Sequence, residues 1–467
     1  MSNILAAVDL GATSGRVMLG SVSHNELSVR PVARFPNGPV QREDGLHWDI
    51  DALYAHVLAG LAAAVREEPS IASIGIDSWA VDYSLIKGGQ MVAPPFHYRD
   101  ERNLAAVDAV HRVVTPAELY EANGLQHLPF NTLFQFAAEK NLSDADSFLL
   151  VPDLLAYWLT GRAVAERTNA STTGMLSITS GQWDDALISR LGYKRSLFPE
   201  LVDPGTALGL LLPDIAAQVG ASIPVTAVGS HDTASAVVAV PATNEDFAYI
   251  SCGTWGLVGV ELEHPVLTEA SRAANFTNEG GVDGRVRYLH NVMGLWLLSE
   301  SVREWQKDDP TLELPGLLAA AAAVDAVVPV FDANDPVFLA PGDMPARIAQ
   351  WFTDRGQAAP ASRAEFVRSI IESLADAFAK AVRLASELSG KPVSVIHIVG
   401  GGSQNELLCQ LTADRSGLAV LAGPVEATAI GNVLVQARAQ GLVSGSLESL
   451  RALVVRAFGP KRYLPRG

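Results

Sequence analysis

The sequence has little cysteine and no long apolar run. Its 467 residues include only Cys252 and Cys409, which cannot build the disulfide framework of a small secreted domain, although one bond between them stays open. No uncharged stretch reaches the roughly 20 apolar residues that span a bilayer. The N-terminal apolar stretch lacks a preceding basic region and is interrupted by Asp9, so it does not resemble a signal peptide. We therefore expect a cytoplasmic protein.

Positive charge is also scarce. The chain has 34 Lys and Arg against 51 Asp and Glu, a formal net charge of −17. Such a surface repels phosphate backbones and anionic lipids, so we expect neither nucleic acid nor a membrane as partner. The sequence also lacks a P-loop, an H-E-x-x-H motif and a C-x-x-C pair. Any nucleotide would have to be bound without a P-loop.

Strand-like and helix-like segments alternate throughout, which predicts an α/β protein. The chain is too long for one core, so we expect two domains. A helix-like run ends at Pro241, and we place the boundary there, giving domains 1–240 and 241–467. The segment FPNGPVQREDG, residues 35–45, is typical of a surface loop.

Two glycine-rich segments, AVDLGATSGRVMLG (7–20) and AYISCGTWGLVGVE (248–261), each predict a strand, a small-residue turn and a second strand. A buried-type strand ending in polar residues follows each hairpin, at 73–86 and at 395–408. The repetition suggests two domains of related design, although glycine-turn hairpins also recur by chance.

Turns of this composition can bind anions through successive backbone N–H groups. Thr13, Ser14 and Thr254 add hydroxyl donors, and Arg16 could chelate phosphate oxygens. Asp9 beside the first turn would repel a bare phosphate, which makes sense if Mg²⁺ lies between them. A plain hairpin with a surface Asp and Arg is the alternative for either segment taken alone.

The segment VGSHDTASAVVAV, residues 228–240, predicts a strand that leads directly into a helix. Asp232 either caps that helix or stands at the mouth of a cleft and accepts a proton from a substrate hydroxyl. His231 beside it could bind a polyol or simply pack. Farther along, IVGGGSQNELL (398–408) could lay a flat group such as a purine against glycine backbone, although a tight strand-to-helix turn would look similar.

Several polar and aromatic clusters suit a sugar, which needs an aromatic face and paired polar groups. Each could equally stabilise a loop. Their members are Asp77, Trp79, Asp82, Arg99, Asp100, Asn131, Asn278 and Asn291.

The motifs, in chain order, resemble the FGGY family of carbohydrate kinases, and in particular its members that act on L-rhamnulose. The blocks are VDLGATSGRVML, SIGIDSWAVDY, FNTLFQ, GSHDTASAV, NEGG, NVMGLWLL, HIVGGGSQN and AGPVEATAIGN, from about residue 7 to about 432. The resemblance implies an α/β, two-domain actin-like ATPase (ribonuclease H-like) fold with a nucleotide and sugar cleft between the domains.

The resemblance also implies roles for individual residues. It implies that Asp232 is the catalytic base and that Asp9 lies at the Mg²⁺ site. The implied sugar contacts are Trp79, Ala80, Asp82, His231, Asp232, Thr233 and Asn291. The implied ATP contacts are Ala12, Thr13, Ser14, Gly15, Arg16, Thr254, Ser299 and Gly401.

Two positions depart from the family pattern. Ala80 stands where the family usually has Gly, which leaves the sugar preference open. Ser299 stands where the family usually has Gln, which leaves one nucleotide contact open. We expect ATP- and Mg²⁺-dependent phosphorylation of L-rhamnulose at the C1 hydroxyl. L-fuculose or L-xylulose is the alternative substrate, and a non-catalytic actin-like nucleotide sensor is the alternative function. The sequence leaves open whether the protein is a monomer or a homodimer.

Overall fold

The computed structural model describes residues 3–466, which form two compact units. Within these residues, the first unit comprises 3–243, Glu261–Tyr288 and Glu426–Phe458, and the second comprises Asn244–Val260, Leu289–Val425 and 459–466. The chain first passes from the first unit to the second after Thr243, three residues beyond the expected boundary at 240/241. A single cut does not describe the division, however, because two later segments return to the first unit.

The first unit contains a six-stranded sheet in the order β14-β15-β6-β1-β2-β3. Strands β1 and β2 form the predicted N-terminal hairpin, and β6 pairs with β1 in parallel. The strands are β1 (Ile4–Leu10), β2 (Ser14–Val22), β3 (Leu27–Pro36), β6 (Ser73–Ser78), β14 (Ala207–Leu210) and β15 (Pro224–Thr226).

A second sheet has seven strands in the order β18-β19-β17-β16-β20-β21-β22. Strands β16 and β17 form the second predicted hairpin, and β20 pairs with β16 in parallel. The strands are β16 (Phe247–Cys252), β17 (Gly256–Leu262), β18 (Thr277–Gly280), β19 (Val286–Val292), β20 (Val395–Val399), β21 (Ala419–Ala422) and β22 (Lys461–Tyr463). Strand β18 belongs to the first unit.

The two sheets share one pattern of strand pairing. In each, the first hairpin strand has an antiparallel partner on one side and a parallel partner on the other. A further parallel strand and then an antiparallel strand complete that side, β15 with β14 in one sheet and β21 with β22 in the other. This shared pattern supports the hypothesis that the units are of related design.

Smaller sheets and short helices complete the first unit. Residues 35–45, expected as a loop, instead contribute to a short hairpin of β4 and β5. The remaining strands are β4 (Pro39–Arg42), β5 (Gly45–Trp48), β7 (Tyr83–Lys87), β8 (Gln90–Met91), β9 (Ser147–Leu150), β10 (Ala165–Glu166), β11 (Leu176–Ser177), β12 (Gln182–Trp183) and β13 (Leu201–Val202). The helices of this unit are α1 (Ile50–Glu67), α2 (Arg102–His111), α3 (Pro116–Asn123), α4 (Thr132–Ala138), α5 (Val151–Thr160), α6 (Arg167–Ala170), α7 (Asp185–Arg190), α8 (Pro213–Val219), α9 (Asp232–Val238), α10 (Glu269–Ala273), α16 (Ala427–Ala439) and α17 (Leu447–Ala457).

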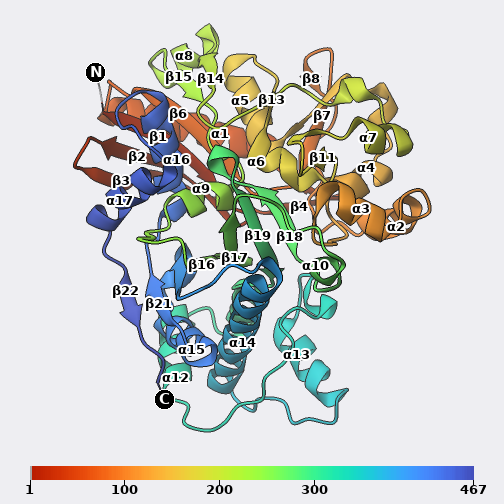
Figure 1. Cartoon of the computed structure of the whole chain (residues 1–467), viewed down its shortest axis with the longest axis vertical. Helices are drawn as coiled ribbons and strands as arrows, with labels where there is room; N and C mark the ends of the chain where they lie inside the picture. Colours follow the sequence, from red (N-terminus) through yellow and green to blue (C-terminus); the bar gives the residue numbers. More distant parts are fainter. Residues whose placement is uncertain (1–2, 467) are drawn as a thin grey trace. The chain divides into compact units, whose positions relative to one another are not determined.

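The second unit is built around α14, a helix of 27 residues that packs against α12 and α15 (Figure 1). A capping box at Ser362 and Glu365 starts α14, and Gly390 in the left-handed conformation ends it. The helices of this unit are α11 (Trp296–Asp308), α12 (Leu314–Ala322), α13 (Met344–Thr353), α14 (Arg363–Ser389) and α15 (Glu406–Ser416). No helix between residues 3 and 466 is both long and apolar enough to cross a membrane.

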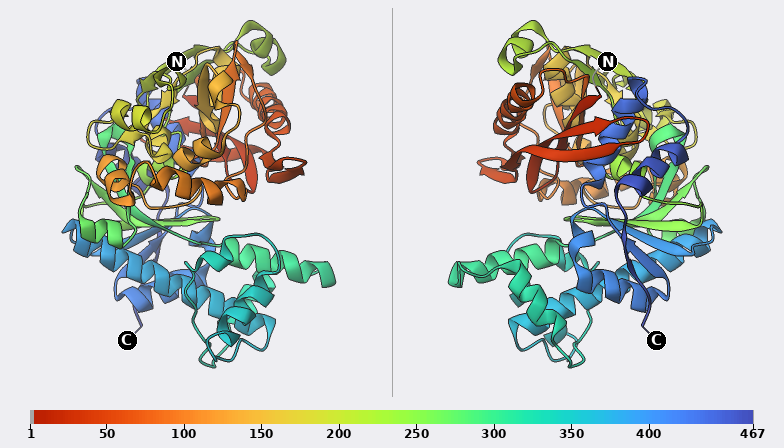
Figure 2. Two further views of the ribbon diagram at one scale, coloured as in Figure 1. Left: turned by 90° about the vertical axis from the view of Figure 1, so that its right-hand side faces the viewer. Right: turned by 90° about the vertical axis from the view of Figure 1, so that its left-hand side faces the viewer.

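The late segment α16 packs directly on the N-terminal sheet, as the blue helix against the red strands in Figure 2 shows. Small residues allow this close approach. Gly431 lies against the backbone of Ser235 in α9, and Gly75 in β6 lies beneath Asn432 and Gln436. Gln436 Nε2 donates to the carbonyl of Ala6 at 3.0 Å, which ties the helix to β1.

Gly431 provides a test of this packing. A Cβ at this position would overlap the Ser235 carbonyl oxygen, which is backbone and cannot rotate away. We expect Gly431→Ala to lower the free energy of unfolding by about 2 kcal/mol. The matched control is Gly316→Ala in α12, where nothing lies within 4 Å of the added Cβ and helix propensity should raise stability by about 0.5–1 kcal/mol. Calorimetry on both variants checks this, and equal stabilities would contradict the close packing of α9 and α16.

Candidate functional site

Three aspartates gather where parallel strands of the first unit end. Asp9 of β1 is the register partner of Asp77 of β6, and Ser78 pairs in parallel with His231. The backbone N–H of Ser78 donates to the Ser230 carbonyl at 2.9 Å, which brings Asp232 to the same edge. Carboxyl ends of parallel strands form the usual ligand-binding edge of an open sheet.

The electrostatics of this edge are unfavourable without a cation. Burial raises the pKa of Asp9 to about 6, with Arg16 acting against the rise and Asp232 adding to it. Burial also raises the pKa of Asp77, and the charge of Asp9 raises it further. Burial raises the pKa of Asp232, opposed by hydrogen bonds from Thr233 and by the charge of Arg287. The side chain of Asp232 nevertheless remains 31% exposed, so a ligand can reach it.

Asp9 and Arg16 lie opposite each other in the hairpin, with Arg16 Nε 3.0 Å from Asp9 Oδ2. The guanidinium is more constrained than the sequence suggested. Its Nη1 also binds Glu426, just ahead of α16, and Glu426 binds Arg34 at 2.9 Å. Two of the three Arg16 nitrogens thus face carboxylates.

The first turn is exposed and braced from below. Thr13 and Ser14 are exposed, Ala12 is half-buried, and Gly15 is buried against Phe35. The Gly11 N–H donates to the Ser14 carbonyl at 2.8 Å, which closes the turn. Asn37 Nδ2 donates to the Gly11 carbonyl at 2.8 Å, and the Asn37 N–H donates to Thr13 at 3.2 Å. Sequence reasoning missed Asn37, whose segment looked like a loop.

The acidic edge fits a hydrated divalent cation. Asp77 Oδ1 is buried and has no hydrogen-bond partner within residues 3–466, while Asp77 Oδ2 accepts from Asn432 Nδ2 at 2.6 Å. No set of three His, Cys, Asp or Glu side chains in the described chain is placed to hold a metal by itself. Mg²⁺ commonly keeps several waters and takes only one or two carboxylates plus substrate phosphates.

The segment before α9 is fixed by a buried carboxylate that the sequence did not reveal. Glu166 Oε2 accepts hydrogen bonds from the N–H and the hydroxyl of Ser230, both at 2.9 Å. His231 is buried at the N-cap position and Asp232 begins the helix, so the predicted helix start is confirmed. The strand predicted before it is wrong in its extent, because β15 already ends at Thr226 and residues 227–230 form an irregular connection. The buried Thr233 donates its hydroxyl to Asp232 at 3.2 Å.

A second buried carboxylate, Asp82, lies among four N–H donors. Its Oδ2 accepts from Trp48 Nε1 at 2.6 Å, from Trp79 Nε1 at 3.1 Å and from the Tyr98 backbone at 3.2 Å. Its Oδ1 accepts from Gln135 Nε2 at 2.9 Å. Burial raises the pKa of Asp82 to about 7 even though these donors oppose the rise. Both oxygens are therefore engaged by the protein, and the indoles of Trp48 and Trp79 are held 4.1 Å apart.

The backbone ahead of Asp82 is strained. Val81 has a φ of 67°, a region that a β-branched residue rarely enters. The Asp82 N–H donates back to the Ala80 carbonyl at 2.9 Å, so residues 80–82 form a γ-turn. Thr132 Oγ1 holds the Val81 carbonyl at 2.7 Å. Strain of this kind persists where the surroundings fix it, often at ligand sites, and the half-buried Ala80 lies at this turn.

Other residues of the sugar-like clusters stabilise loops. Asn131 donates to the Gln126 carbonyl, and Asn278 bonds backbone groups of Gly124 and Val266. Asp100 accepts from the N–H groups of Leu46 and Arg102. For these three residues the loop interpretation left open by the sequence describes what is seen.

In the second unit, the Gly253–Trp255 turn is supported by the start of α11. The N–H groups of Leu295 and Trp296 donate to the carbonyls of Gly253 and Thr254 at 3.0 and 3.1 Å. Gly294, at φ 53°, is pressed so closely on this turn that a Cβ would overlap the Thr254 and Trp255 backbone. Thr254 is half-buried on this turn, and Ser299 is exposed one turn into α11.

The triple-glycine segment packs on the same hairpin. A Cβ at Gly402 would overlap Cys252 Sγ, whereas nothing lies within 4 Å of a Cβ at Gly401, which is exposed. Asn405 caps α15 by accepting from the Leu408 N–H at 3.0 Å. Gly401 thus presents open backbone near the turn that carries Thr254. Asn291 is half-buried on β19 of this unit.

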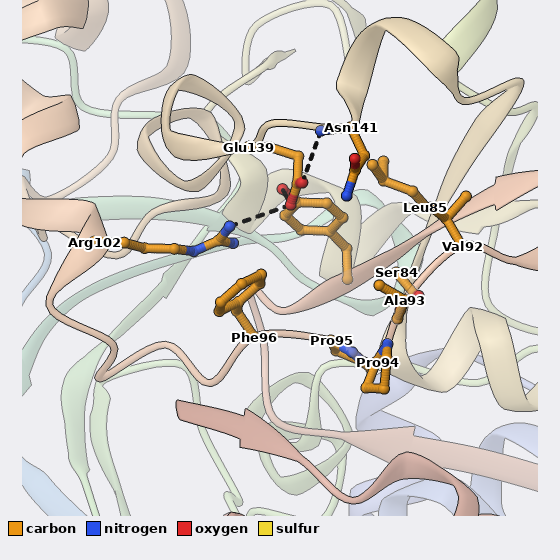
Figure 3. Close-up of a pocket in the computed structure, with 11 residues that line it drawn as sticks. Ser84, Leu85, Val92, Ala93, Pro94, Pro95, Phe96, Arg102, Glu139 and Asn141 are labelled. Atoms are coloured by element: carbon orange, nitrogen blue, oxygen red, sulfur yellow. Dashed lines mark hydrogen bonds and ion pairs between the residues drawn. The ribbon is translucent and has the colours of Figure 1, made fainter. Parts of the chain in front are cut away.

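A separate pocket lies elsewhere in the first unit (Figure 3), with about 290 Å³ of space that opens to solvent. Arg102 stacks 3.5 Å from the Phe96 ring and pairs with Glu139 at 3.2 Å. None of the site residues predicted from the sequence lines it. The pocket is therefore distinct from the acidic edge that holds Asp9, Asp77 and Asp232.

Comparison of the chain with known families gives two adjacent matches. Residues 4–239 match the N-terminal domain of the FGGY family of carbohydrate kinases, and residues 248–440 match its C-terminal domain. A rhamnulokinase of Bacteroides thetaiotaomicron is 40% identical, over 98% of this chain and 95% of that protein. A rhamnulokinase of Klebsiella pneumoniae strain 342 is 43% identical, over 92% and 88%.

Solved structures resemble the chain over almost all of its length. Ligand-bound xylulose kinase from Lactobacillus acidophilus has a TM-score of 0.79 at 16% identity, covering 99% of this chain and 94% of that one. Plasmodium falciparum glycerol kinase with ADP has a TM-score of 0.78 at 15% identity, covering 100% and 94%. At such identities the likeness concerns the fold alone. It confirms the predicted α/β, two-domain, actin-like fold class.

The donor-rich surroundings of Asp82 lead to a prediction. In Asp82→Asn, the amide nitrogen must face at least one of the four N–H groups, so a buried donor loses its acceptor. We expect a loss of about 1–3 kcal/mol in the free energy of unfolding. Trp48→Phe, which removes one donor and leaves the carboxylate with three, serves as the matched control and should lose less hydrogen-bond energy at Asp82. Urea unfolding of both variants checks this, and a fully stable Asp82→Asn would contradict the arrangement.

Proposed function

Because the chain belongs to the FGGY family of carbohydrate kinases, we propose that it transfers the γ-phosphoryl group of ATP to the C1 hydroxyl of L-rhamnulose. The products are L-rhamnulose 1-phosphate and ADP. The observation that carries the chemistry is Asp232, a reachable carboxylate at the ligand-binding edge of the sheet, with acidic neighbours suited to a cation. The rhamnulokinase relatives support the choice of sugar. We propose a cytoplasmic location, in keeping with two cysteines that are both buried and free.

In the proposed mechanism Asp232 accepts the proton of the C1 hydroxyl as that oxygen bonds to the γ-phosphorus. The bond between that phosphorus and the departing ADP oxygen breaks in the same step. Asp9 and Asp77 would hold Mg²⁺ through water, and this ion would neutralise charge on the phosphates. General-base assistance of this kind is typically worth about 10²–10⁴ in rate.

The remaining residues divide between the two ligands. We propose Trp79, Ala80, His231, Thr233 and Asn291 as sugar contacts. Asp82 would contribute indirectly, by fixing the Trp79 indole, because its oxygens already accept four N–H groups. The proposed ATP contacts are Ala12, Thr13, Ser14, Gly15, Arg16, Thr254, Ser299 and Gly401. For Arg16 to reach phosphate, its bond to Glu426 would have to open or be shared.

A panel of ketoses tests the substrate. With ATP and Mg²⁺ in a coupled assay of ADP release, kcat/KM should be highest for L-rhamnulose and lower for L-fuculose and L-xylulose. Chelation of Mg²⁺ should abolish turnover. A higher kcat/KM for another ketose would replace the sugar, and tight ATP binding without transfer to any ketose would favour a nucleotide sensor.

The base is tested separately. Asp232→Asn should lower kcat by about 10²–10⁴ because the amide cannot take the hydroxyl proton. ATP affinity, measured by calorimetric titration, should stay near that of the wild type. The matched control is Asp325→Asn, an exposed carboxylate far along the chain in the second unit, which should leave kcat unchanged. Wild-type turnover in Asp232→Asn would remove this residue from its role.

A further inference from the structure

Two charged groups lie close to Nδ1 of His231, and each requires a different protonation state of that nitrogen. Its Nδ1 lies 2.9 Å from Arg287 Nη2 and 3.3 Å from Glu279 Oε2. Its other nitrogen, Nε2, lies 3.4 Å from Asp232 Oδ1. A guanidinium only donates and a carboxylate only accepts, so Nδ1 must be bare to satisfy Arg287 and protonated to satisfy Glu279.

Arg287, rather than Glu279, is positioned to form the hydrogen bond with His231 Nδ1. Its side chain is fully buried on β19, and its Nε donates to the Gly280 carbonyl at 2.9 Å. Its Nη2 also lies 3.1 Å from Glu279 Oε2, so the carboxylate already has a charged partner. Although burial alone would raise the pKa of Glu279, the charge of Arg287 holds that pKa below its usual value. Glu279 therefore stays anionic and balances the guanidinium.

We propose that Arg287 is a positioning residue that fixes His231 as the neutral tautomer carrying its proton on Nε2. The donation from Nη2 occupies the Nδ1 lone pair, and the ring proton then faces Asp232. Because its Nδ1 lone pair is occupied and its Nε2 carries a proton, His231 has no free lone pair with which to take the proton of the sugar hydroxyl. Asp232 is left as the acceptor, oriented by the imidazole N–H. This inference rests on the proposed role of Asp232 as base.

Fixing one tautomer matters because an imidazole in the other tautomer would turn a bare Nε2 toward Asp232. Two acceptors would then face each other, and the carboxylate would rotate or bind a proton. Arg287 also favours the ionised form of Asp232 through its charge. The residue acts through His231 and touches no reacting atom.

The tautomer can be observed without any substrate. The chain has ten histidines, and selective ¹⁵N labelling of histidine with long-range ¹H–¹⁵N spectra distinguishes bare from protonated ring nitrogens. His231→Gln assigns the signal. We expect the wild type to show a bare Nδ1 and a protonated Nε2. A protonated Nδ1 in the wild type would overturn the proposal, whatever the enzyme phosphorylates.

Three variants test the cause. Arg287→Lys keeps a cationic donor and should keep the Nε2–H signal. Arg287→Met leaves Nδ1 facing Glu279 alone and should show Nδ1 protonated. The double variant Arg287→Met with Glu279→Leu removes both buried charges, which proteins often tolerate, and should show mixed tautomers even if the single variant fails to fold.

Kinetics with the ketose that the wild type prefers complete the test. The double variant should lose about 10–100-fold in kcat, with the KM for ATP changed little, whereas Arg287→Lys should recover most of the rate. A merely structural role predicts lost stability without this split. A double variant that keeps both the Nε2–H signal and wild-type kcat would overturn the proposal.

Discussion

The parallel pairing of β1 with β6 is the constraint on which the rest of the first unit depends. Both strands end in an aspartate at the same register, so forming the sheet forces Asp9 and Asp77 together in a buried position. The parallel bridge from Ser78 to His231 then adds Asp232. Buried like charges disfavour the ionised forms, so this edge stores a repulsion that a bound cation would relieve. The fold thereby accepts a local electrostatic cost at this edge of the sheet.

Helix α16 makes that arrangement tolerable. Asn432 donates to Asp77 and accepts from Gln436, which in turn donates to β1, so one turn of helix satisfies polar groups on two strands. The contact requires close approach, which Gly431 and Gly75 permit. The following helix is anchored too, because Arg451 in α17 forms a buried double hydrogen bond with Glu261. The late return of the chain to the first unit thus completes the site built by its beginning.

Local chemistry made part of this predictable from the sequence. The hairpins, the helix start at Asp232 and the facing of Asp9 and Arg16 follow from turn composition and the two-residue strand period. The partners that decide what these residues do come from far away in the chain. Arg16 binds Glu426, His231 binds Arg287, and Ser230 binds Glu166. No local pattern marks such pairs. Asp82 shows the limit most clearly, since its role depends on Trp48, Trp79 and Gln135 meeting around it.

These long-range partners also determine where ligand chemistry can act. Asp82 is saturated by N–H donors, Glu166 is committed to Ser230 and Thr168, and both nitrogens of His231 face charged groups. At the strand ends, by contrast, Asp77 Oδ1 has no hydrogen-bond partner in the described part of the chain, and Asp232 remains reachable. A buried polar atom without a partner costs free energy that a ligand or its metal can recover. At this edge of the sheet, Asp77 is therefore suited to a hydrated cation and Asp232 to a hydroxyl proton.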